Sequence, residues 1–216
     1  MTKKKNYTIV DLFSGVGGLS LGFEKNGFNL LLANDNDQDA ANTFKLNHPD
    51  KKFYLGNIQE IDEKLLERMI DNKKVDVLVG GIPCQSFSMV GFRTTNKSNH
   101  SKDPRHYLFK EFIRIAKILS PKVIIIENVK AIISSHGGKI KNEIISDLGK
   151  IGYQIDYKIL NAADYGVPQT RERAIFIGNN IGVKNIFPKP THSPENYVGV
   201  GEAFKNLPKN NYLRRK

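Results

Sequence analysis

The chain has 216 residues, of which 39% are hydrophobic and 25% charged, and it carries a formal net charge of +11. This length can bury the core of one domain, and no apolar run is long enough to cross a bilayer. The single cysteine excludes an intramolecular disulfide and argues against a cysteine-based zinc site. The excess of Lys and Arg favours a polyanionic partner such as nucleic acid, although a lysine-rich proteome would produce the same excess. We expect a cytoplasmic protein.

Seven runs of apolar and β-branched residues, each bounded by turn residues, predict strands. They are Tyr7–Phe13, Phe28–Ala33, Lys52–Leu55, Val75–Gly80, Lys122–Glu127, Tyr153–Leu160 and Arg173–Gly178. Helical patterns separate most of them, at Leu19–Asn26, Gln38–Asn47, Ile61–Asn72, Tyr107–Leu119 and Ile140–Ile151. This alternation predicts an α/β fold with a parallel sheet, helices around it, and ligands at the carboxyl ends of the strands.

Three connections depart from this alternation. No helix fits between the last two predicted strands, so we expect them to pair antiparallel. The polar stretch from Gln85 to His106 is long for a connection inside a compact domain, and we interpret it as a lid over the site. After Gly178 the composition shifts to Asn, Pro, Lys and Gly, which predicts a domain over residues 1–178 and a linker or tail over residues 179–216.

A glycine-rich turn follows the first predicted strand. It runs from Asp11 to Gly18 and would let the backbone approach a bound nucleoside closely. The dinucleotide fingerprint G-x-G-x-x-G fails here, because counting from Gly15 its last position is Ser20. The turn therefore favours a nucleoside over the pyrophosphate of NAD or FAD.

Polar residues also follow the next two strands. Asp35 could bind the two hydroxyls of a ribose, and Asn57 with Ile58 would suit the edge and face of an adenine. The alternative is that Asp35 or Asp37 only caps the helix that follows.

The fourth strand runs into Pro83-Cys84-Gln85, where an exposed nucleophile would lie. A thiolate is a strong nucleophile, so a lone cysteine at a strand end suggests covalent catalysis. Glu127 ends the fifth strand, and Arg171 and Arg173 begin the seventh. We expect these side chains to converge at one edge of the sheet, although the arginines could instead pair with Glu172.

The order of these motifs resembles the DNA cytosine-5 methyltransferase family across nearly all of residues 8–178. The matching segments are Asp11 to Gly18, Asn34-Asp35, Gly56-Asn57-Ile58, Pro83-Cys84-Gln85 with Phe87-Ser88, Leu108-Phe109, Glu127-Asn128-Val129, Asn161 to Gln169, and Arg171-Glu172-Arg173. The resemblance implies a class I S-adenosylmethionine-dependent, Rossmann-like sheet whose last strand is antiparallel. It also implies S-adenosylmethionine as cofactor and a cytosine flipped out of double-stranded DNA.

The resemblance assigns a role to each candidate residue. Cys84 would add to C6 of cytosine, Glu127 would bind the N3 edge, and Arg173 would bind O2 with support from Arg171. The cofactor residues would be Asp11, Phe13, Gly15, Gly17, Asp35, Asn36, Asn57, Ile58, Pro83 and Leu108. No metal is expected, since the five histidines have neither triad nor metal spacing.

Two departures from the family pattern concern the cofactor. Many members carry Asp at the position of Asn57 and a large apolar residue at that of Asn36, so we expect weakened cofactor affinity. Members also continue into a target-recognition region and a final segment with a Gly-Asn core, which nothing between Asn179 and Lys216 matches.

We therefore expect a second polypeptide, or a missing part of a longer protein, to supply recognition, within a bacterial restriction-modification system. A tRNA cytosine-5 methyltransferase and a non-catalytic DNA-binding relative are the alternatives.

Overall fold

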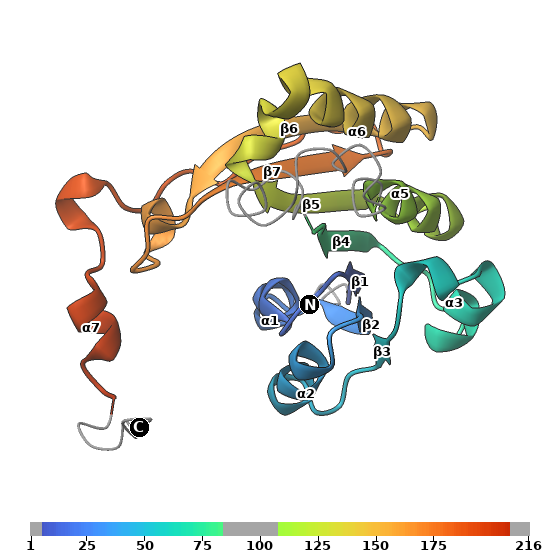
Figure 1. Cartoon of the computed structure of the whole chain (residues 1–216), viewed down its shortest axis with the longest axis horizontal. Coiled ribbons are helices and arrows are strands. Elements are labelled where there is room, and N and C mark those ends of the chain that lie inside the picture. The colour runs from blue at the N-terminus through green and yellow to red at the C-terminus, as the bar shows by residue number, and fades with distance from the viewer. Residues whose placement is uncertain (1–5, 84–107, 208–216) are drawn as a thin grey trace, which may run out of the picture.

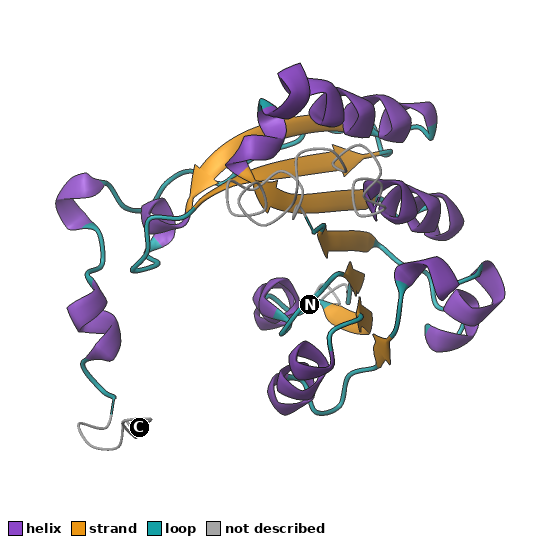
Figure 2. Ribbon diagram, viewed as in Figure 1, coloured by secondary structure: helices purple, strands orange, loops and turns teal. Residues whose placement is uncertain are grey.

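The computed structural model describes residues 6–83 and 108–207, apart from the side chain of His136. The strands are β1 (Thr8–Leu12), β2 (Asn29–Asp35), β3 (Phe53–Leu55), β4 (Val77–Gly81), β5 (Val123–Val129), β6 (Gln154–Asn161) and β7 (Glu172–Asn179). The α-helices are α1 (Gly18–Lys25), α2 (Gln38–Asn47), α3 (Glu63–Met69), α5 (Leu108–Leu119), α6 (Lys139–Lys150) and α7 (Val200–Phe204). Short 3-10 turns include η1 (Ile58–Glu60), η4 (Lys130–Ile133), η5 (Ser135–Gly138), η6 (Ala162–Tyr165) and η7 (Pro194–Asn196) (Figures 1 and 2).

All seven strands form one sheet in the order β3-β2-β1-β4-β5-β7-β6. The neighbouring pairs from β3 to β5 are parallel, whereas β7 runs antiparallel to both β5 and β6. The predicted seven-stranded, mostly parallel sheet with an antiparallel last strand is therefore confirmed. The carboxyl ends of β1, β2, β4 and β5 meet along one edge, where most of the candidate residues lie.

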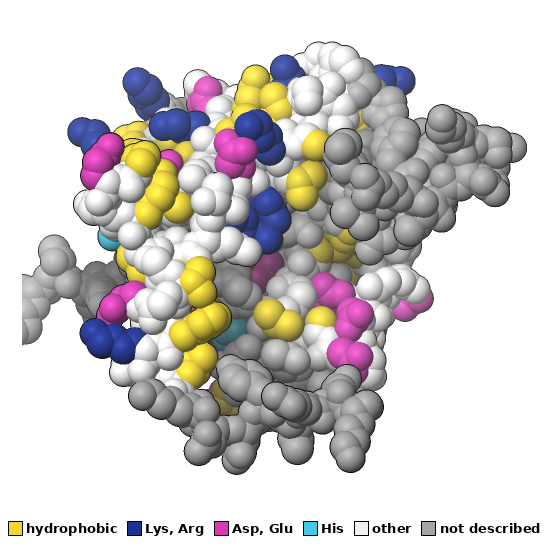
Figure 3. All heavy atoms as spheres, turned by 60° about the vertical axis from the view of Figure 1, so that its left-hand side comes forward, with side chains coloured by type: hydrophobic (Ala, Val, Ile, Leu, Met, Phe, Trp, Pro, Cys, Tyr) yellow, Lys and Arg dark blue, Asp and Glu magenta, His cyan; other side chains and the backbone are white. Residues whose placement is uncertain are grey.

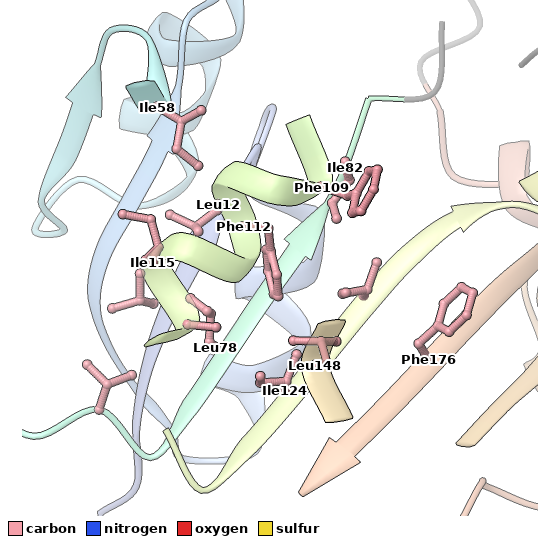
Figure 4. Packing of buried hydrophobic residues seen from close by; sticks show 14 of the residues in the cluster. Leu12, Ile58, Leu78, Ile82, Phe109, Phe112, Ile115, Ile124, Leu148 and Phe176 are labelled. Carbon is pink, nitrogen blue, oxygen red and sulfur yellow. The ribbon is translucent and has the colours of Figure 1, made fainter. Parts of the chain in front are cut away.

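Helices cover both faces of the sheet. On one face, α3, α5 and α6 bury a continuous apolar cluster against the strands (Figure 4); Leu66, Phe112, Ile115 and Leu148 are fully buried in it. On the other face, α1 and α2 pack over Ile9, Leu30 and Val79 with the buried ring of Phe44. Burial of this apolar surface is the main term that holds helices to a sheet.

Most element boundaries differ by one to three residues from those that the sequence predicts, and two of these differences have a clear cause. The predicted helix at 61–72 begins only at Glu63, because the side chain of Asp62 accepts a hydrogen bond from the Leu65 N–H at 2.7 Å and caps α3. Strand β2 extends two residues further, to Asp35, because it pairs with β1 up to Asn34 and with β3 up to Asp35. Asn34 and Asp35 are thus strand residues, so the geometry of the strand fixes the directions of their side chains.

The segment after β7 stays attached to the domain for some distance. Asn185 donates to the Gln154 carbonyl at 3.0 Å, the Thr191 and His192 N–H groups donate to the Asp164 carbonyl, and the Tyr197 hydroxyl donates to the Asp164 carboxylate at 2.6 Å. Helix α7 then extends away from the sheet (Figure 1), and its apolar Val200 and Phe204 are more than half exposed. In the described ranges no helix has the length and apolar character needed to cross a membrane.

Candidate active site

A first pocket, here named the β1–β4 pocket, opens at the carboxyl ends of the first four strands. It encloses about 330 Å³, part of which is open to solvent. Its lining consists of Phe13, Asn34, Asp35, Asn36, Gly56, Asn57, Ile58, Gln59, Pro83 and Leu108. The structure thus brings most of the predicted cofactor residues together, from five separate segments of the chain. Asn34 and Gly56 also line the pocket; both lie in segments that match the family but were given no role from the sequence. Gln59 is a lining residue that the sequence did not indicate.

Phe13 turns the chain from β1 into the glycine-rich loop. Its φ of 55° lies in the left-handed region that residues with a side chain rarely adopt, and such strain is concentrated at functional sites. The next residue, Ser14, donates its N–H to the Asn34 carbonyl at 2.9 Å. This bond ties the loop to the end of β2, so Phe13 lines the pocket beside the β2 residues.

Asp35 binds the glycine-rich loop as well as lining the pocket. Its Oδ2 accepts the Gly15 N–H at 2.8 Å, and its Oδ1 accepts the Asp37 N–H at 3.1 Å. Helix capping falls to Asp37, whose side chain accepts the Ala40 N–H at 2.8 Å. The capping alternative therefore applies to Asp37, while Asp35 remains available at the pocket.

Gly15 and Gly17 do not line the pocket but shape the loop beneath it. Gly17 has a φ of 88°, and a Cβ there would lie 2.4 Å from Nε2 of His48, which excludes any side chain. The His48 ring is buried, with Nδ1 2.5 Å from the Glu24 carboxylate and Nε2 3.2 Å from the Gly17 carbonyl. Both neighbours are acceptors, so His48 makes both hydrogen bonds only when both ring nitrogens carry protons.

Asp11 is completely buried below the loop, away from the lining of the pocket. Its Oδ2 accepts a hydrogen bond from the Ser20 hydroxyl at 2.6 Å, while its Oδ1 has no hydrogen-bond partner among the residues that the structure describes. Burial raises the pKa of this carboxyl to about 7, against the lowering effect of the Ser20 hydrogen bonds. Asp11 thus supports the loop from below, with a carboxyl that folding favours in its protonated form.

A second pocket, here named the β5–β7 pocket, lies on the same edge of the sheet. It encloses about 510 Å³, including open solvent, and is lined by Glu127, Leu160, Ala162, Tyr165, Arg171, Arg173, Ile175 and Pro188. Within it, Nε of Arg173 lies 2.8 Å from Oε1 of Glu127, and Nη2 of Arg171 lies 3.9 Å from the same oxygen. The expected convergence of Glu127, Arg171 and Arg173 is therefore observed. The Glu172 carboxylate does not compete with Glu127 for Arg173, since it pairs with Lys130 at 2.9 Å.

Strand register explains this convergence. Glu127 pairs with Ile175, Val129 pairs with Arg173, and Arg173 pairs with Leu160 across β5, β7 and β6. Paired residues project on the same face, and residues two apart on a strand do so as well. Glu127, Arg173 and Ile175 therefore share the face that lines the pocket.

Gly81 lies between the two pockets. A Cβ on Gly81 would lie 3.6 Å from both the Phe13 carbonyl oxygen and Oε2 of Glu127, so this position without a side chain borders a residue of each pocket. Just beyond it, Nδ2 of Asn128 donates to the Ile82 carbonyl at 3.1 Å, which fixes the chain that leads to Pro83. Cys84 and the expected lid at 85–106 lie outside the described residues.

Tyr165 and Pro188 are pocket residues that the sequence did not indicate. The Tyr165 hydroxyl donates to the Pro188 carbonyl at 3.1 Å, and burial raises the pKa of that hydroxyl. Tyr165 lay within a matched segment and could have been considered, whereas Pro188 comes from the stretch interpreted as a tail. Alternation along β7 could have found Ile175, two residues after Arg173.

Charge is distributed unevenly over the surface. In the face shown in Figure 3, Lys and Arg side chains (dark blue) lie mainly in the upper half, where Figure 1 places β6, β7 and α6. Asp and Glu side chains (magenta) occur in both halves of this face, with a cluster at the lower right. Over the described parts of the chain, no group of three or more His, Cys, Asp and Glu residues could hold a metal ion.

The doubly wound sheet, with its antiparallel last strand and a pocket at the ends of β1–β4 beside a Glu–Arg pocket, defines a Rossmann-like methyltransferase. The chain belongs to the family of C-5 cytosine-specific DNA methylases, whose sequence model matches residues 7–216.

Relatives in this family share much of the sequence. The Type II methyltransferase M1.HphI of Haemophilus parahaemolyticus is 41% identical over 204 residues, which cover 94% of this chain and 54% of that protein. M.AquIA of Picosynechococcus sp. is 37% identical, with 91% of this chain and 81% of that protein covered. The chain thus spans about half the length of M1.HphI and most of that of M.AquIA.

A solved structure shares the fold. A DNA modification methyltransferase encoded within an E. coli prophage superimposes with a TM-score of 0.79 at 30% identity, over 95% of this chain and 56% of that one.

Proposed function

We propose that this chain is the catalytic part of a DNA cytosine-5 methyltransferase, which transfers a methyl group from S-adenosylmethionine to C5 of a cytosine flipped out of duplex DNA. The observation that carries the proposal is the adjacency of the two pockets: the carboxylate of Glu127 and the backbone of Phe13 face the same side-chain-free position at Gly81. One pocket would hold the methyl donor and the other the base.

The β1–β4 pocket fits the nucleoside of S-adenosylmethionine by the chemistry of its lining. Asp35 offers carboxylate oxygens to a ribose, Phe13 and Ile58 offer apolar surface to an adenine, and Asn57 offers an amide to the edge of the base. Leu108 and Pro83 would line the methionine part. When bound, S-adenosylmethionine supplies an electrophilic methyl group.

In the proposed reaction, the Cys84 thiolate adds to C6 of cytosine, and the ring electrons that this displaces make C5 nucleophilic. Glu127 hydrogen-bonds the N3 and amino edge and shares a proton with N3, which offsets the charge that builds on the ring. The Arg173 guanidinium binds O2, and Arg171 supports it or contacts the DNA backbone. After the methyl group is on C5, a base removes the C5 proton and the C6–S bond breaks, which restores the aromatic ring and the thiolate.

The ion pair between Glu127 and Arg173 supports these roles. The two side chains are each about a quarter exposed at the mouth of the pocket. An entering cytosine carries the two kinds of group that this pair can bind: donors on its amino edge for the carboxylate and an acceptor at O2 for the guanidinium. The base would therefore replace part of the existing pair without leaving either charged group short of a hydrogen-bond partner.

We also propose that target recognition lies elsewhere, on a second polypeptide or on a further part of a longer protein, in a restriction-modification system. Support comes from M1.HphI, of which this chain matches about half. Basic residues near the site would add sequence-independent affinity for the phosphates of double-stranded DNA.

A trapping experiment tests the proposal. The chain is incubated with tritiated S-adenosylmethionine and duplex DNA that contains 5-fluorocytosine, whose C5–F bond prevents release, alone and with lysate of its source. We expect a labelled covalent adduct with wild type and none with Cys84→Ser. An adduct with the chain alone would contradict the need for a partner. Absence of an adduct both without and with lysate, from folded protein, would contradict the proposed activity. Preferential labelling of tRNA would favour the RNA-modifying alternative.

A further inference from the structure

Four polar side chains at the rim of the β1–β4 pocket form a directional chain of hydrogen bonds. The Tyr54 hydroxyl donates to Oε2 of Glu60 at 3.3 Å, Nδ2 of Asn57 donates to Oε1 of Glu60 at 3.0 Å, and Nδ2 of Asn36 donates to Oδ1 of Asn57 at 3.1 Å. Asn36 and Asn57 are the two residues at which this chain departs from the family pattern. Each of these hydrogen bonds is therefore donated in the direction of Glu60.

The direction of these bonds has a simple cause. An ionised carboxylate only accepts hydrogen bonds, so Asn57 must present its NH2 group to Glu60. The carbonyl oxygen of Asn57 then lies on the side of Asn36, another residue that lines the pocket. An amide oxygen has two acceptor positions, and Asn36 uses one of them.

The backbone around Asn57 is fixed independently of these side-chain hydrogen bonds. Arg114 of α5 donates from Nη2 to the Ile58 carbonyl at 2.8 Å and from Nη1 to the Ile61 carbonyl at 2.7 Å. The Glu60 N–H donates to the Asn57 carbonyl at 3.0 Å within η1. With the backbone fixed, the orientation of the Asn57 amide depends on its side-chain partners.

We propose that Glu60 is a positioning residue, which holds the Asn57 amide with its oxygen available to the ligand and thereby makes the pocket select a 6-amino purine over a 6-oxo purine. This inference rests on the proposed function, since it takes the nucleoside of S-adenosylmethionine as the ligand. The oriented oxygen of Asn57 accepts from the 6-amino group of adenine as an aspartate would. A 6-oxo group would bring a second acceptor against it, which costs a hydrogen bond and adds repulsion.

Binding of two ligands tests the proposal: S-adenosylhomocysteine and its 6-oxo counterpart, S-inosylhomocysteine, each titrated calorimetrically into the full chain. We expect wild type to bind the adenine form about tenfold more tightly, as one hydrogen bond allows. In Glu60→Gln the ratio falls to about two, because a glutamine amide can donate as well as accept and leaves Asn57 free to turn. The exposed Glu67 of α3 provides a matched control, and Glu67→Gln keeps the wild-type ratio.

A rescue variant separates positioning from a general effect on the pocket. Asp accepts in either orientation, so the double variant Asn57→Asp with Glu60→Gln regains the wild-type ratio although Glu60 is absent. The positioning role is overturned if Glu60→Gln leaves the affinity ratio of the two ligands unchanged, or if wild type binds both ligands equally. Neither result contradicts the proposed cofactor site. Binding of neither ligand by folded wild-type protein overturns the proposed cofactor, and this inference with it.

Discussion

The two pockets differ in how their side chains are held. Around the β1–β4 pocket, Asp35, Asn57 and Asn36 are each fixed by hydrogen bonds to the backbone or to one another, over a loop that the buried Asp11 and His48 support. In the β5–β7 pocket, Glu127 and Arg173 pair with each other at the end of two strands, where solvent reaches both. The first arrangement suits a ligand that must be bound in one pose, and the second suits a base that must enter and displace an existing partner.

The largest expected effect lies in the second pocket. In Glu127→Gln the side chain keeps its size but loses the charge that pairs with Arg173 and the proton that it would share with the base. We expect methyl transfer to fall by about 10³-fold or more while cofactor affinity stays unchanged, measured by radiolabel incorporation and calorimetry. The control is Glu172→Gln, whose carboxylate pairs with Lys130 outside the pocket. Loss of cofactor binding in Glu127→Gln would show that the two pockets are not independent.

The buried Asp11, which supports the loop of the β1–β4 pocket, predicts an effect of pH on the free energy of unfolding. Burial raises the folded-state pKa of Asp11 from the ordinary aspartate value of 3.8 to about 7, so folding favours the protonated carboxyl. This group stabilises the fold fully below about pH 4, and its contribution declines as the pH rises to about 7. Relative to Asp11→Asn, wild type should lose on the order of 4 kcal/mol of unfolding free energy over that interval, since each pH unit corresponds to about 1.4 kcal/mol.

Urea unfolding of both proteins at a series of pH values measures this difference. Other carboxylates, such as Asp76 beside Lys122, have lowered pKa values, but they are common to both proteins and cancel in the comparison. A difference between wild type and Asp11→Asn that does not change with pH would mean that Asp11 is ionised in the folded chain.

Substitution of Gly81, which lies between the two pockets, has an intermediate expected effect. A valine at position 81 would place methyl groups against the Phe13 backbone and the Glu127 carboxylate, whereas an alanine Cβ finds ordinary contact distances of 3.6 Å. We expect Gly81→Val to lower methyl transfer by about 10²-fold, because a small misplacement of reacting groups is sufficient for such a loss. Gly81→Ala should retain most activity with unchanged cofactor affinity. Full activity of folded Gly81→Val would rule out methyl transfer past position 81.

The smallest expected effect is on cofactor affinity, from a substitution of Asn57, one of the two residues that depart from the family pattern. From sequence alone, Asn57→Asp is expected to tighten cofactor binding. In the structure, Nδ2 of Asn57 lies 3.0 Å from Glu60, so an aspartate there would bring two carboxylates together. We therefore expect Asn57→Asp alone to leave the affinity for S-adenosylmethionine unchanged or a few-fold weaker, and the added Glu60→Gln to improve it. Tighter binding by the single variant in calorimetry would contradict this account.

Much of the molecule follows from local sequence patterns. The seven strands and the order of the motifs were predicted because apolar periodicity and turn residues act over a few positions. The antiparallel pairing of β6 with β7 was predicted from the absence of a crossover helix, and it is confirmed. The family was indicated because its motifs follow the strand ends in a fixed order.

Tertiary structure alone decided the contacts between segments far apart in the chain. Strand β2 extends to Asp35 because it pairs on both sides, and this extension decides that Asp37 caps α2 while Asp35 binds the loop. Pro188 lines the β5–β7 pocket because its carbonyl accepts a hydrogen bond from Tyr165 of η6. The bonds of Asn57 to Glu60 and Asn36 likewise needed the folded strand ends. The sequence determined the elements and the chemistry available, because both are set by neighbouring residues. The orientation of each side chain was decided only in the fold, because it depends on the partners that long-range packing brings within hydrogen-bond distance.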